Sequence, residues 1–577
     1  MSQGKVNLKS KFYDEVTDLP LQEYPRPQLQ RDSYINLNGY WDYAIRKKGE
    51  DVEPFDGKIL VPFSPESLLS GVLRQVTPKD ILYYERSFDV PSKFINKKTF
   101  IHFTAVDYSC TVTLNDIVIG THKGGYHPFS FDVSGIIKPG ENIIKLKVKD
   151  PSDTSYISRG KQKINHGNIW YTPQSGIWGT VWLESVTKDY ISELSIVPNI
   201  DEGTVEINAN TSALKIDVTV LDNGNKIARM NGIPPLTIPI ESFELWSPEN
   251  PKLYDLQITA GKDKVKSYFG MRKFSCEKDE KGISRLFLNN KPYFHKGVLD
   301  QVYWSDGMLT PPSDNAMIHD ITMLKEMGFN MIRKHIKIEP LRWYYHCDRL
   351  GMLVWQDMVN GGGKYNLLAI GALPLIGIHL KDNKYGFFAR GSYKGRKEYI
   401  KEVKETIPLL KNSVSIAMWV PFNEGWGQFD SNKITDIILD MDATRTIDRT
   451  SGWHDQGTSD FVSNHTYFTP IKCPKDNRCF LLSEFGGYSL PIKEHMYNPS
   501  KTFGYRIYKS PEDLQKAYRN LFEKQIIPNI SKGLSATVYT QLSDVEEETN
   551  GLTTYDRLYE KFPREMLKEI NDRCIIE

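Results

Sequence analysis

The stretch from Ser415 to Gln428 reads S-I-A-M-W-V-P-F-N-E-G-W-G-Q. Its apolar run, Ile416–Val420, contains β-branched and aromatic residues, which predicts a strand buried on both faces of a parallel sheet. Asn423 and Glu424 follow where this strand should end. Because a (β/α)8 barrel keeps its catalytic groups at the carboxyl ends of its strands, the stretch predicts a barrel strand that presents a polar pair to a pocket.

Apolar strand-like runs alternate with helical stretches on both sides of this segment, over residues 276–577. Two ranges have helical periodicity, Asp314–Met327 and Pro340–Leu350. Alternating strands and helices over about 300 residues are typical of one (β/α)8 barrel, the TIM barrel. The eight predicted strands are Tyr293–Val298, Asn330–Arg333, Met352–Gln356, Ser415–Val420, Thr446–Ser451, Phe461–Ser463, Phe480–Leu482 and Ala536–Gln541.

Two all-β regions precede the predicted barrel. In residues 1–187, short alternating segments are separated by turn signals, which is typical of a jelly-roll sandwich. Residues 188–275 have the size and strand pattern of an immunoglobulin-like sandwich. We expect Trp170, Trp178 and Trp182 to pack in the core. The clearest strand-like runs are Phe100–Phe103, Thr111–Leu114, Ile143–Val148, Val181–Leu183, Val205–Ile207, Ile216–Leu221 and Leu256–Thr259.

The composition excludes several classes of function. Lys plus Arg number 73 and Asp plus Glu number 72, so the formal net charge of +1 favours neither nucleic-acid nor membrane binding. The start, Met1–Ser10, has no apolar secretory segment, and the apolar stretch Leu367–Leu380 is too short for a membrane span. We therefore expect a cytoplasmic protein. Six cysteines form no disulfide framework, and Cys473 and Cys479 fit no zinc motif, so we expect free thiols.

Polar and aromatic side chains follow every predicted barrel strand, and barrel loops at this face converge on one pocket. A lone glutamate at a strand end is more often solvated, but here two glutamates, Glu424 and Glu484, follow the fourth and seventh strands. Two facing carboxylates are what glycoside cleavage requires, since one donates a proton and the other attacks the anomeric carbon. The further groups at strand ends are Asp300, Arg333, His335, Trp355, Asp357, Asn423, Trp453, Asp455, His465, Tyr467, Gln541 and Asp544.

Four further motifs occur along the chain: P-R-P-Q-L-Q-R from Pro25, L-N-G-Y-W-D-Y ending at Tyr43, Q-S-G-I-W-G-T-V-W-L-E ending at Glu184, and N-G-L-T-T-Y-D-R from Asn550 to Arg557. Together with the groups at the strand ends, these motifs make the chain resemble glycoside hydrolase family 2. The resemblance implies a sugar-binding jelly roll, an immunoglobulin-like domain and a TIM barrel. It also implies that Glu424 is the acid/base, that Glu484 is the nucleophile and that Asn423 contacts the sugar 2-hydroxyl.

The resemblance assigns further substrate contacts, with some departures. Arg333 is retained, but His335 stands one position earlier than the family's histidine, so substrate contact and packing are equal alternatives for it. Third-strand W-Q-D, ending at Asp357, is similar to mannosidase-like members. His465 and Tyr467 lie where the family keeps a tyrosine that contacts the nucleophile. Trp453 and Tyr539 are expected to stack on a sugar face or to line the rim.

The resemblance also bears on metals and on a neighbouring acidic run. The galactosidases that hold Mg²⁺ carry acidic and histidine ligands in the loop that is Val359–Asn366 here, and this loop has no anionic cluster. We therefore expect no metal and no cofactor. The acidic run Asp544–Glu548 is expected to be a solvated loop without a role.

These features predict a retaining exo-β-glycosidase of the β-galactosidase class, with a carbohydrate as its partner and the oligomeric state left open. The alternatives are β-glucuronidase, β-galacturonidase or β-mannosidase-like specificity, or a carbohydrate-binding protein without catalysis. The family's glucuronidases hold the substrate carboxylate with an Asn-x-Lys-Gly motif. Asn498 and Lys501 match it poorly, because the spacing differs and the glycine is absent. Lys334 and Lys337 are the alternative cations for a substrate carboxylate, which keeps the uronide option open.

Overall fold

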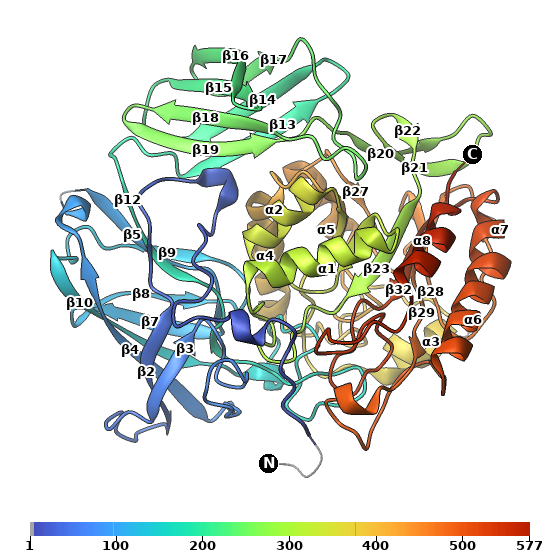
Figure 1. Ribbon diagram of the computed structural model, residues 1–577, viewed down its shortest axis with the longest axis horizontal. Coiled ribbons are helices and arrows are strands. Elements are labelled where there is room, and N and C mark those ends of the chain that lie inside the picture. The colour runs from blue at the N-terminus through green and yellow to red at the C-terminus, as the bar shows by residue number, and fades with distance from the viewer. Residues whose placement is uncertain (1–4, 96, 376, 577) are drawn as a thin grey trace.

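The computed structural model describes residues 5–95, 97–375 and 377–576. Two earlier expectations fall partly outside the described residues. These are the expectation for Met1–Ser10, of which Met1–Gly4 are not described, and that for Leu367–Leu380, of which Ile376 is not described. The described chain forms two β-sandwiches and a barrel, in the predicted order (Figure 1). Within those residues, none of the helices combines the length and apolarity that a bilayer crossing needs.

The first sandwich packs a six-stranded sheet against a four-stranded one. Its strands alternate buried and exposed side chains, as in β10, whose inward residues Ile144, Leu146 and Val148 are buried. Trp178 and Trp182 are buried as predicted, whereas Trp170 is only half-buried. The larger sheet has the order β3 (Gly57–Val61), β2 (Gly39–Lys47), β4 (Asp80–Val90), β10 (Gly140–Lys149), β7 (Ser109–Leu114), β8 (Ile117–Lys123), and the smaller one β1 (Ile35–Asn36), β12 (Val181–Val186), β5 (Lys98–Phe103), β9 (Phe129–Asp132).

The second sandwich is smaller and has its own apolar core. Three strands pair in one sheet and four in the other, all antiparallel. The first sheet has the order β13 (Glu193–Asn199), β14 (Thr204–Asn210), β17 (Leu236–Pro239), and the second β16 (Asn225–Gly232), β15 (Ile216–Asp222), β18 (Tyr254–Ala260), β19 (Asp263–Phe269). A hairpin sheet of β20 (Phe274–Lys278), β21 (Ser284–Leu288) and β22 (Lys291–Pro292) leads into the barrel.

The barrel sheet contains all eight predicted strands, joined by parallel ladders. The fifth strand, β27, is much shorter than predicted, and a hydrogen bond of 2.7 Å from Ser463 Oγ to Asp448 Oδ2 links the fifth and sixth strand regions. The strand order is β27 (Thr446–Ile447), β26 (Ile416–Val420), β25 (Leu353–Asp357), β24 (Met331–Lys334), β23 (His295–Asp300), β32 (Leu534–Thr540), β29 (Cys479–Gly486), β28 (Phe461–Thr466).

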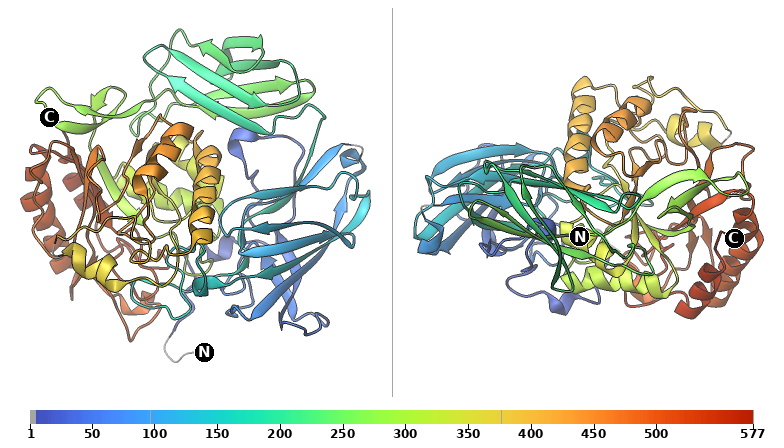
Figure 2. Two further views of the ribbon diagram at one scale, coloured as in Figure 1. Left: turned by 180° about the vertical axis from the view of Figure 1, so that it is seen from behind. Right: turned by 90° about the horizontal axis from the view of Figure 1, so that it is seen from above.

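Helices surround the barrel sheet, and one of them meets the first sandwich. Helix α4 lies between that sandwich and the barrel (Figures 1 and 2). From this helix, Thr406 contacts His127 of the sandwich at 2.8 Å, and Glu402 accepts a hydrogen bond from Ser158. The helices are α1 (Asp314–Glu326), α2 (Leu341–Leu350), α3 (Leu373–Leu375), α4 (Tyr393–Leu410), α5 (Ser431–Met441), α6 (Pro511–Leu521), α7 (Ile527–Ile530) and α8 (Arg564–Asp572).

The acidic run after β32 also joins the first sandwich to the barrel. The prediction that Asp544–Glu548 is a solvated loop is wrong, because these side chains are buried. Thr172 N donates to Glu546 Oε1 at 2.9 Å, and the Tyr171 hydroxyl donates to Glu548. A buried carboxylate needs such donors, and here a loop of the sandwich supplies them. The hydrogen bonds to Asp544–Glu548 therefore hold the sandwich loop that contains Tyr171 and Thr172 against the carboxyl ends of the barrel strands.

Candidate active site

The two glutamates reach the pocket through local departures from regular structure. Glu424 has φ 51°, in the left-handed region that non-glycine residues rarely adopt, and its amide donates to Ser451 O at 2.9 Å. On β29, Leu482 and Phe485 both pack in the core that includes the surrounding helices. Strict alternation would place these two residues on opposite faces, but the ladder to β32 shifts between them. This irregularity turns Glu484 into the barrel, as bulges beside active sites commonly do.

The two carboxyl groups face each other beside one imidazole. One oxygen of Glu424, one oxygen of Glu484 and a ring nitrogen of His465 all lie within 4.8 Å of one another. His465 Nδ1 is 2.8 Å from Glu424 Oε1 and 3.6 Å from Glu484 Oε2. The sequence therefore located correctly the pair that the barrel brings together, and His465 lies between its members.

Glu484 is held as an ionised group. Tyr467 donates to its Oε2 at 2.5 Å, and Arg333 Nη1 lies 3.2 Å from its Oε1. Burial by itself would raise the pKa of Glu484, but the charges of His465 and Arg333 outweigh this effect, so the pKa is lowered. The Tyr467 hydroxyl stays protonated, because burial and the neighbouring Glu484 raise its pKa. Tyr467 is itself stacked on Tyr505, with ring centroids 3.6 Å apart.

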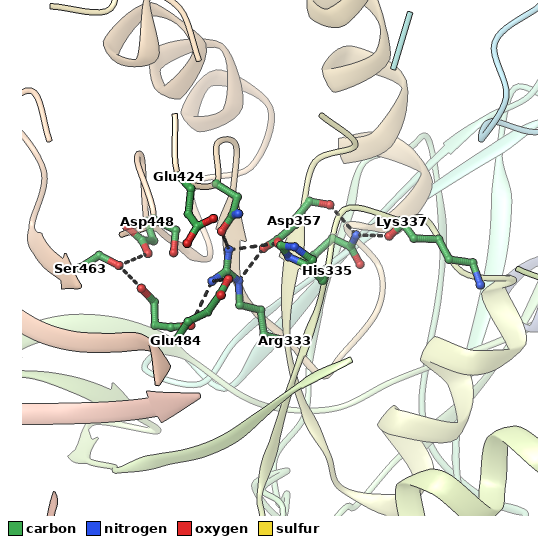
Figure 3. A network of polar contacts seen from close by, with 12 residues as sticks. Arg333, His335, Lys337, Asp357, Glu424, Asp448, Ser463 and Glu484 are labelled. Carbon is green, nitrogen blue, oxygen red and sulfur yellow. Dashed lines mark hydrogen bonds and ion pairs between the residues drawn. The ribbon is translucent and has the colours of Figure 1, made fainter. Parts of the chain in front are cut away.

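Arg333 links the nucleophile candidate to two other predicted residues (Figure 3). Its guanidinium pairs with both oxygens of Asp357, at 3.0 and 3.1 Å, and its Nη2 donates to Asn423 Oδ1 at 2.8 Å. An arginine only donates, so the amide oxygen of Asn423 faces Arg333. Among the described residues, none accepts a hydrogen bond from the NH2 group of Asn423, so this group can donate to a bound hydroxyl.

His335 belongs to the same network. Its Nδ1 lies 2.7 Å from Asp357 Oδ2, and the ring is almost fully buried. Burial lowers the pKa of His335, and the charge of Lys161 lowers it further. Trp453 is half-buried, with its ring centroid 6.3 Å from that of His465, so it lines the edge of the site.

The roles expected of Tyr539, Lys334 and Lys337 are wrong. Tyr539 is fully buried and packs edge-on against Phe485 and Tyr518, away from the barrel interior, so it stacks on no sugar. Lys334 faces the helices because its neighbour Arg333 faces inward, and its ammonium pairs with Asp300 and Glu339. 

Lys337 also has partners already and points away from the two glutamates (Figure 3). Its Nζ lies 3.0 Å from Glu339 Oε2 and donates to Leu309 O at 2.6 Å. Burial lowers the pKa of Lys337 to about 8. Neither Lys334 nor Lys337 is therefore available to hold a substrate carboxylate. Asn498 donates to Glu547 at 2.9 Å, and Lys501 is largely exposed.

An aromatic group beside Glu424 was missed. Trp426 stacks on Trp170 of the first sandwich at 5.2 Å, and Tyr365 packs against both rings, at 5.7 Å from Trp170 and 6.0 Å from Trp426. Trp426 stands two positions after Glu424 in the quoted stretch, so its place in the sequence was a usable signal. The sequence held no such signal for Trp170, because its aromatic-rich segment predicts packing in the core as well as a place at the site.

The convergence of Glu424, His465 and Glu484 is also the pattern of a three-ligand metal site. Two observations weigh against a resident ion. Arg333 and Tyr467 already donate to Glu484, and a cation between the carboxylates would occupy the space that a reacting carbon needs. The expectation of a metal-free site stays a prediction.

Three family models match consecutive parts of the chain. The first, described as the sugar binding domain of glycosyl hydrolases family 2, matches residues 65–186. The second, described as glycosyl hydrolases family 2, matches residues 189–272. The third, described as the TIM barrel domain of that family, matches residues 281–549. Their order is the order of the three folded units.

Curated relatives carry two different names. A "Putative beta-glucuronidase" of Formosa agariphila is 27% identical over 305 residues, which are 48% of this chain and 34% of the relative. A "Beta-galactosidase" of Thermoanaerobacter pseudethanolicus is 22% identical over 499 residues, which are 80% of this chain and 62% of the relative. The chain thus spans about a third of the first relative's length and less than two thirds of the second's.

Solved structures share the whole architecture. A β-D-glucuronidase of Dictyoglomus thermophilum has a TM-score of 0.76 at 18% identity, covering 95% of this chain and 98% of its own. A Ruminococcus gnavus β-glucuronidase in complex with D-glucuronic acid has a TM-score of 0.70 at 18% identity, covering 96% of this chain and 99% of its own. At this level of identity the likeness establishes the fold alone.

Proposed function

We propose that this chain, which belongs to glycoside hydrolase family 2, is a retaining exo-β-glycosidase that removes a terminal β-linked sugar. The observation that carries the proposal is the approach of Glu424 and Glu484, which have carboxyl oxygens within 4.8 Å. Retaining enzymes hold their carboxyl groups about 5–5.5 Å apart, whereas inverting enzymes need about 6.5–9.5 Å to admit a water. The pair therefore fits direct attack on the anomeric carbon.

In the first step, a carboxylate oxygen of Glu484 attacks the anomeric carbon, and the bond from that carbon to the leaving oxygen breaks. Glu424 donates its proton to the leaving oxygen, so an alcohol departs and a glycosyl ester of Glu484 remains. Arg333 and Tyr467 keep Glu484 ionised and oriented before the attack. They also leave it a good leaving group for the second step.

In the second step, water replaces the departed alcohol. The ionised Glu424 takes a proton from this water, whose oxygen attacks the anomeric carbon and releases the Glu484 carboxylate. Two inversions at one carbon give net retention. The free NH2 group of Asn423, oriented by Arg333, is placed to donate to the sugar 2-hydroxyl, a contact that strengthens in the transition state.

The exo mode is supported by the loops around the pair. The first sandwich contacts the loop after β25 through a β-bridge between Ser158 and Gly361 and through the stacked rings of Trp170 and Tyr365. These contacts place the first sandwich beside the loop after β25. We infer that they restrict one side of the site, which favours the end of a saccharide over its middle.

For the sugar itself, the sequence alone ranks a galactoside first. Relatives carry names for both galactoside and glucuronide hydrolysis, so the proposed function leaves both sugar classes open. A carbohydrate-binding protein without catalysis is the rival from another class. The intact network around Glu424 and Glu484 argues against it, since a binding protein has no need to hold one carboxylate ionised beside another.

A panel of nitrophenyl β-glycosides at pH 5 to 8 tests the proposal. We expect turnover of at least one member by the wild type, at least about 1,000-fold lower turnover by Glu484→Gln, and unchanged turnover by Glu494→Gln, an exposed glutamate used as the control. Absence of turnover on the whole panel, with binding of a sugar retained, would favour the rival.

A further inference from the structure

Lys161 of the first sandwich reaches the wall of the candidate active site. Its side chain is buried, with 8% of the residue exposed. The ammonium lies over the rings of Trp426 and Tyr171, at 5.7 and 5.6 Å from their centroids. It is also close enough to His335 for its charge to lower the pKa of that imidazole. Lys161 thus stands between the loop that carries Glu424 and the loop that follows β24.

The backbone around Lys161 is fixed from both sides. The Gly160 amide donates to Asn360 O at 3.0 Å, and Tyr171 N donates to Lys161 O at 3.1 Å. Gly160 has φ 64°, and a Cβ there would lie 3.2 Å from Ile336 O, next to His335. Another residue here would be strained by its positive φ and crowded against Ile336 O, so glycine suits this close approach. The position of Lys161 is built into the contact between sandwich and barrel.

The ammonium of Lys161 differs from three buried cations on β24 and in the loop that follows it. Arg333, Lys334 and Lys337 all have carboxylate partners. Within the part of the chain that the structure describes, Lys161 Nζ has neither a hydrogen-bond acceptor nor an ion-pair partner, and two ring faces are its contacts. An ammonium has three N–H donors, and a desolvated charge without a counter-ion is costly. An anion is the group that would satisfy this site.

We propose that Lys161 binds the carboxylate of the substrate's glycone, and that the enzyme's substrates are therefore β-linked uronic acids. The inference rests on the proposed function, because it places the uronic acid over Glu424 and Glu484. It assigns recognition of the acid to a residue of the first sandwich, so the substrate site is shared between two domains. Lys334, Lys337 and Lys501 take no part in this recognition.

The experiment compares kcat/KM on nitrophenyl β-D-glucuronide, β-D-galacturonide, β-D-galactoside and β-D-glucoside. Lys161→Met keeps the apolar stem between the two rings and removes the charge. Lys163→Met is the matched control, because it removes a charge two residues away, on a half-buried side chain over Trp170. A carboxyphenyl β-D-galactoside, with its carboxylate on the leaving group, separates the two sides of the scissile bond.

We expect the wild type to prefer a uronide. Lys161→Met should reduce the ratio of kcat/KM for uronide to that for galactoside at least about 30-fold, as for loss of one partner of a buried charge pair. Lys161→Arg should restore part of the ratio, and Lys163→Met should leave it unchanged. A wild type that hydrolyses galactosides and ignores uronides overturns the inference while the proposed function stands. The inference is also overturned if Lys161→Met leaves the ratio of kcat/KM for uronide to galactoside unchanged. A loss of kcat/KM confined to the carboxyphenyl galactoside would likewise overturn it.

If the enzyme hydrolysed no glycoside of the panel, this result would count against the proposed function. The inference about Lys161 could then still be tested by calorimetry. Free D-glucuronate and D-galacturonate should bind the wild type more tightly than D-glucose and D-galactose. Lys161→Met should abolish this difference, with a far-UV spectrum and melting curve like those of the wild type. Equal binding of acidic and neutral sugars by the wild type would overturn the inference.

Discussion

His465 Nδ1 lies 2.8 Å from Glu424 Oε1, so the candidate acid/base is held by an imidazole that also approaches Glu484, at 3.6 Å. The ring is fixed on its other side, where Nε2 lies 3.2 Å from Ser451 Oγ. Ser451 also accepts the backbone hydrogen bond from Glu424. One short segment thus positions both the backbone and the side chain of Glu424.

The first prediction follows from this contact. His465→Ala leaves Glu424 without its nearest partner, and a hydrogen bond to a charged group contributes about 1.5–3 kcal/mol. We expect kcat/KM to fall about 10- to 100-fold on alkyl glycosides, whose leaving groups need a proton. It should fall less on dinitrophenyl glycosides, whose leaving groups do not. Glu494→Gln, a change at an exposed glutamate, is the control. Equal losses on both kinds of substrate would show that His465 does not act through Glu424.

The second prediction separates the roles of the two glutamates. Glu424→Ala should cripple alkyl glycosides and spare the first step on activated aryl glycosides, and added azide should then raise turnover and give a β-glycosyl azide. Glu484→Ala should lose activity on both, and azide should give the α-product. If azide gave the α-product with Glu424→Ala and the β-product with Glu484→Ala, the roles of acid/base and nucleophile would be exchanged.

The third prediction concerns pH. The pKa of Glu484 is lowered from its ordinary 4.5, since the charges of His465 and Arg333 outweigh the effect of burial. The nucleophile stays ionised down to that lowered value, so the acid limb of kcat/KM should lie below pH 4.5. The same shift stabilises the fold above pH 4.5, and this contribution is lost as pH falls through the lowered value. Arg333→Gln should move the acid limb to higher pH. An unmoved limb would assign it to another group.

The fold could be predicted from sequence because its signals are local. Each barrel strand is a short apolar run, and all eight lie where the runs predict them. The apolar runs do not predict the irregularity in β29 that turns Glu484 inward. A bulge depends on the register between β29 and β32, which the sequence of one strand does not contain. Glu484 itself could be found because it follows an apolar run, and the resemblance to the family then assigned its role.

The side chains around the pair were predicted less completely, and the reasons differ. Alternation along β24 could have excluded Lys334, since Arg333 and its neighbour must face opposite ways. Lys161 and Trp170 could not be found, because they reach the site only through packing between two domains. The burial of Asp544–Glu548 depends on the same contact, so three of the omissions have one physical cause.

The fourth prediction is independence from metal. Glu484 already receives hydrogen bonds from Arg333 and Tyr467, and a divalent cation would prefer several further oxygen ligands. After exhaustive dialysis against EDTA, we expect full activity on the best substrate and no gain on titration with Mg²⁺ or Mn²⁺. A loss of tenfold or more, about 1.4 kcal/mol of barrier, that Mg²⁺ restores would mean that Glu424, His465 and Glu484 hold an ion.

The most direct test of the proposed mechanism is the configuration of the first sugar released. Carboxyl oxygens within 4.8 Å leave room for attack by Glu484 and not for a water between the carboxylates. Proton NMR of the anomeric region in the first minutes of hydrolysis should show the β-anomer forming first, with the α-anomer rising only at the rate of mutarotation. Initial release of the α-anomer from a β-glycoside would contradict the double displacement and the roles assigned to Glu424 and Glu484.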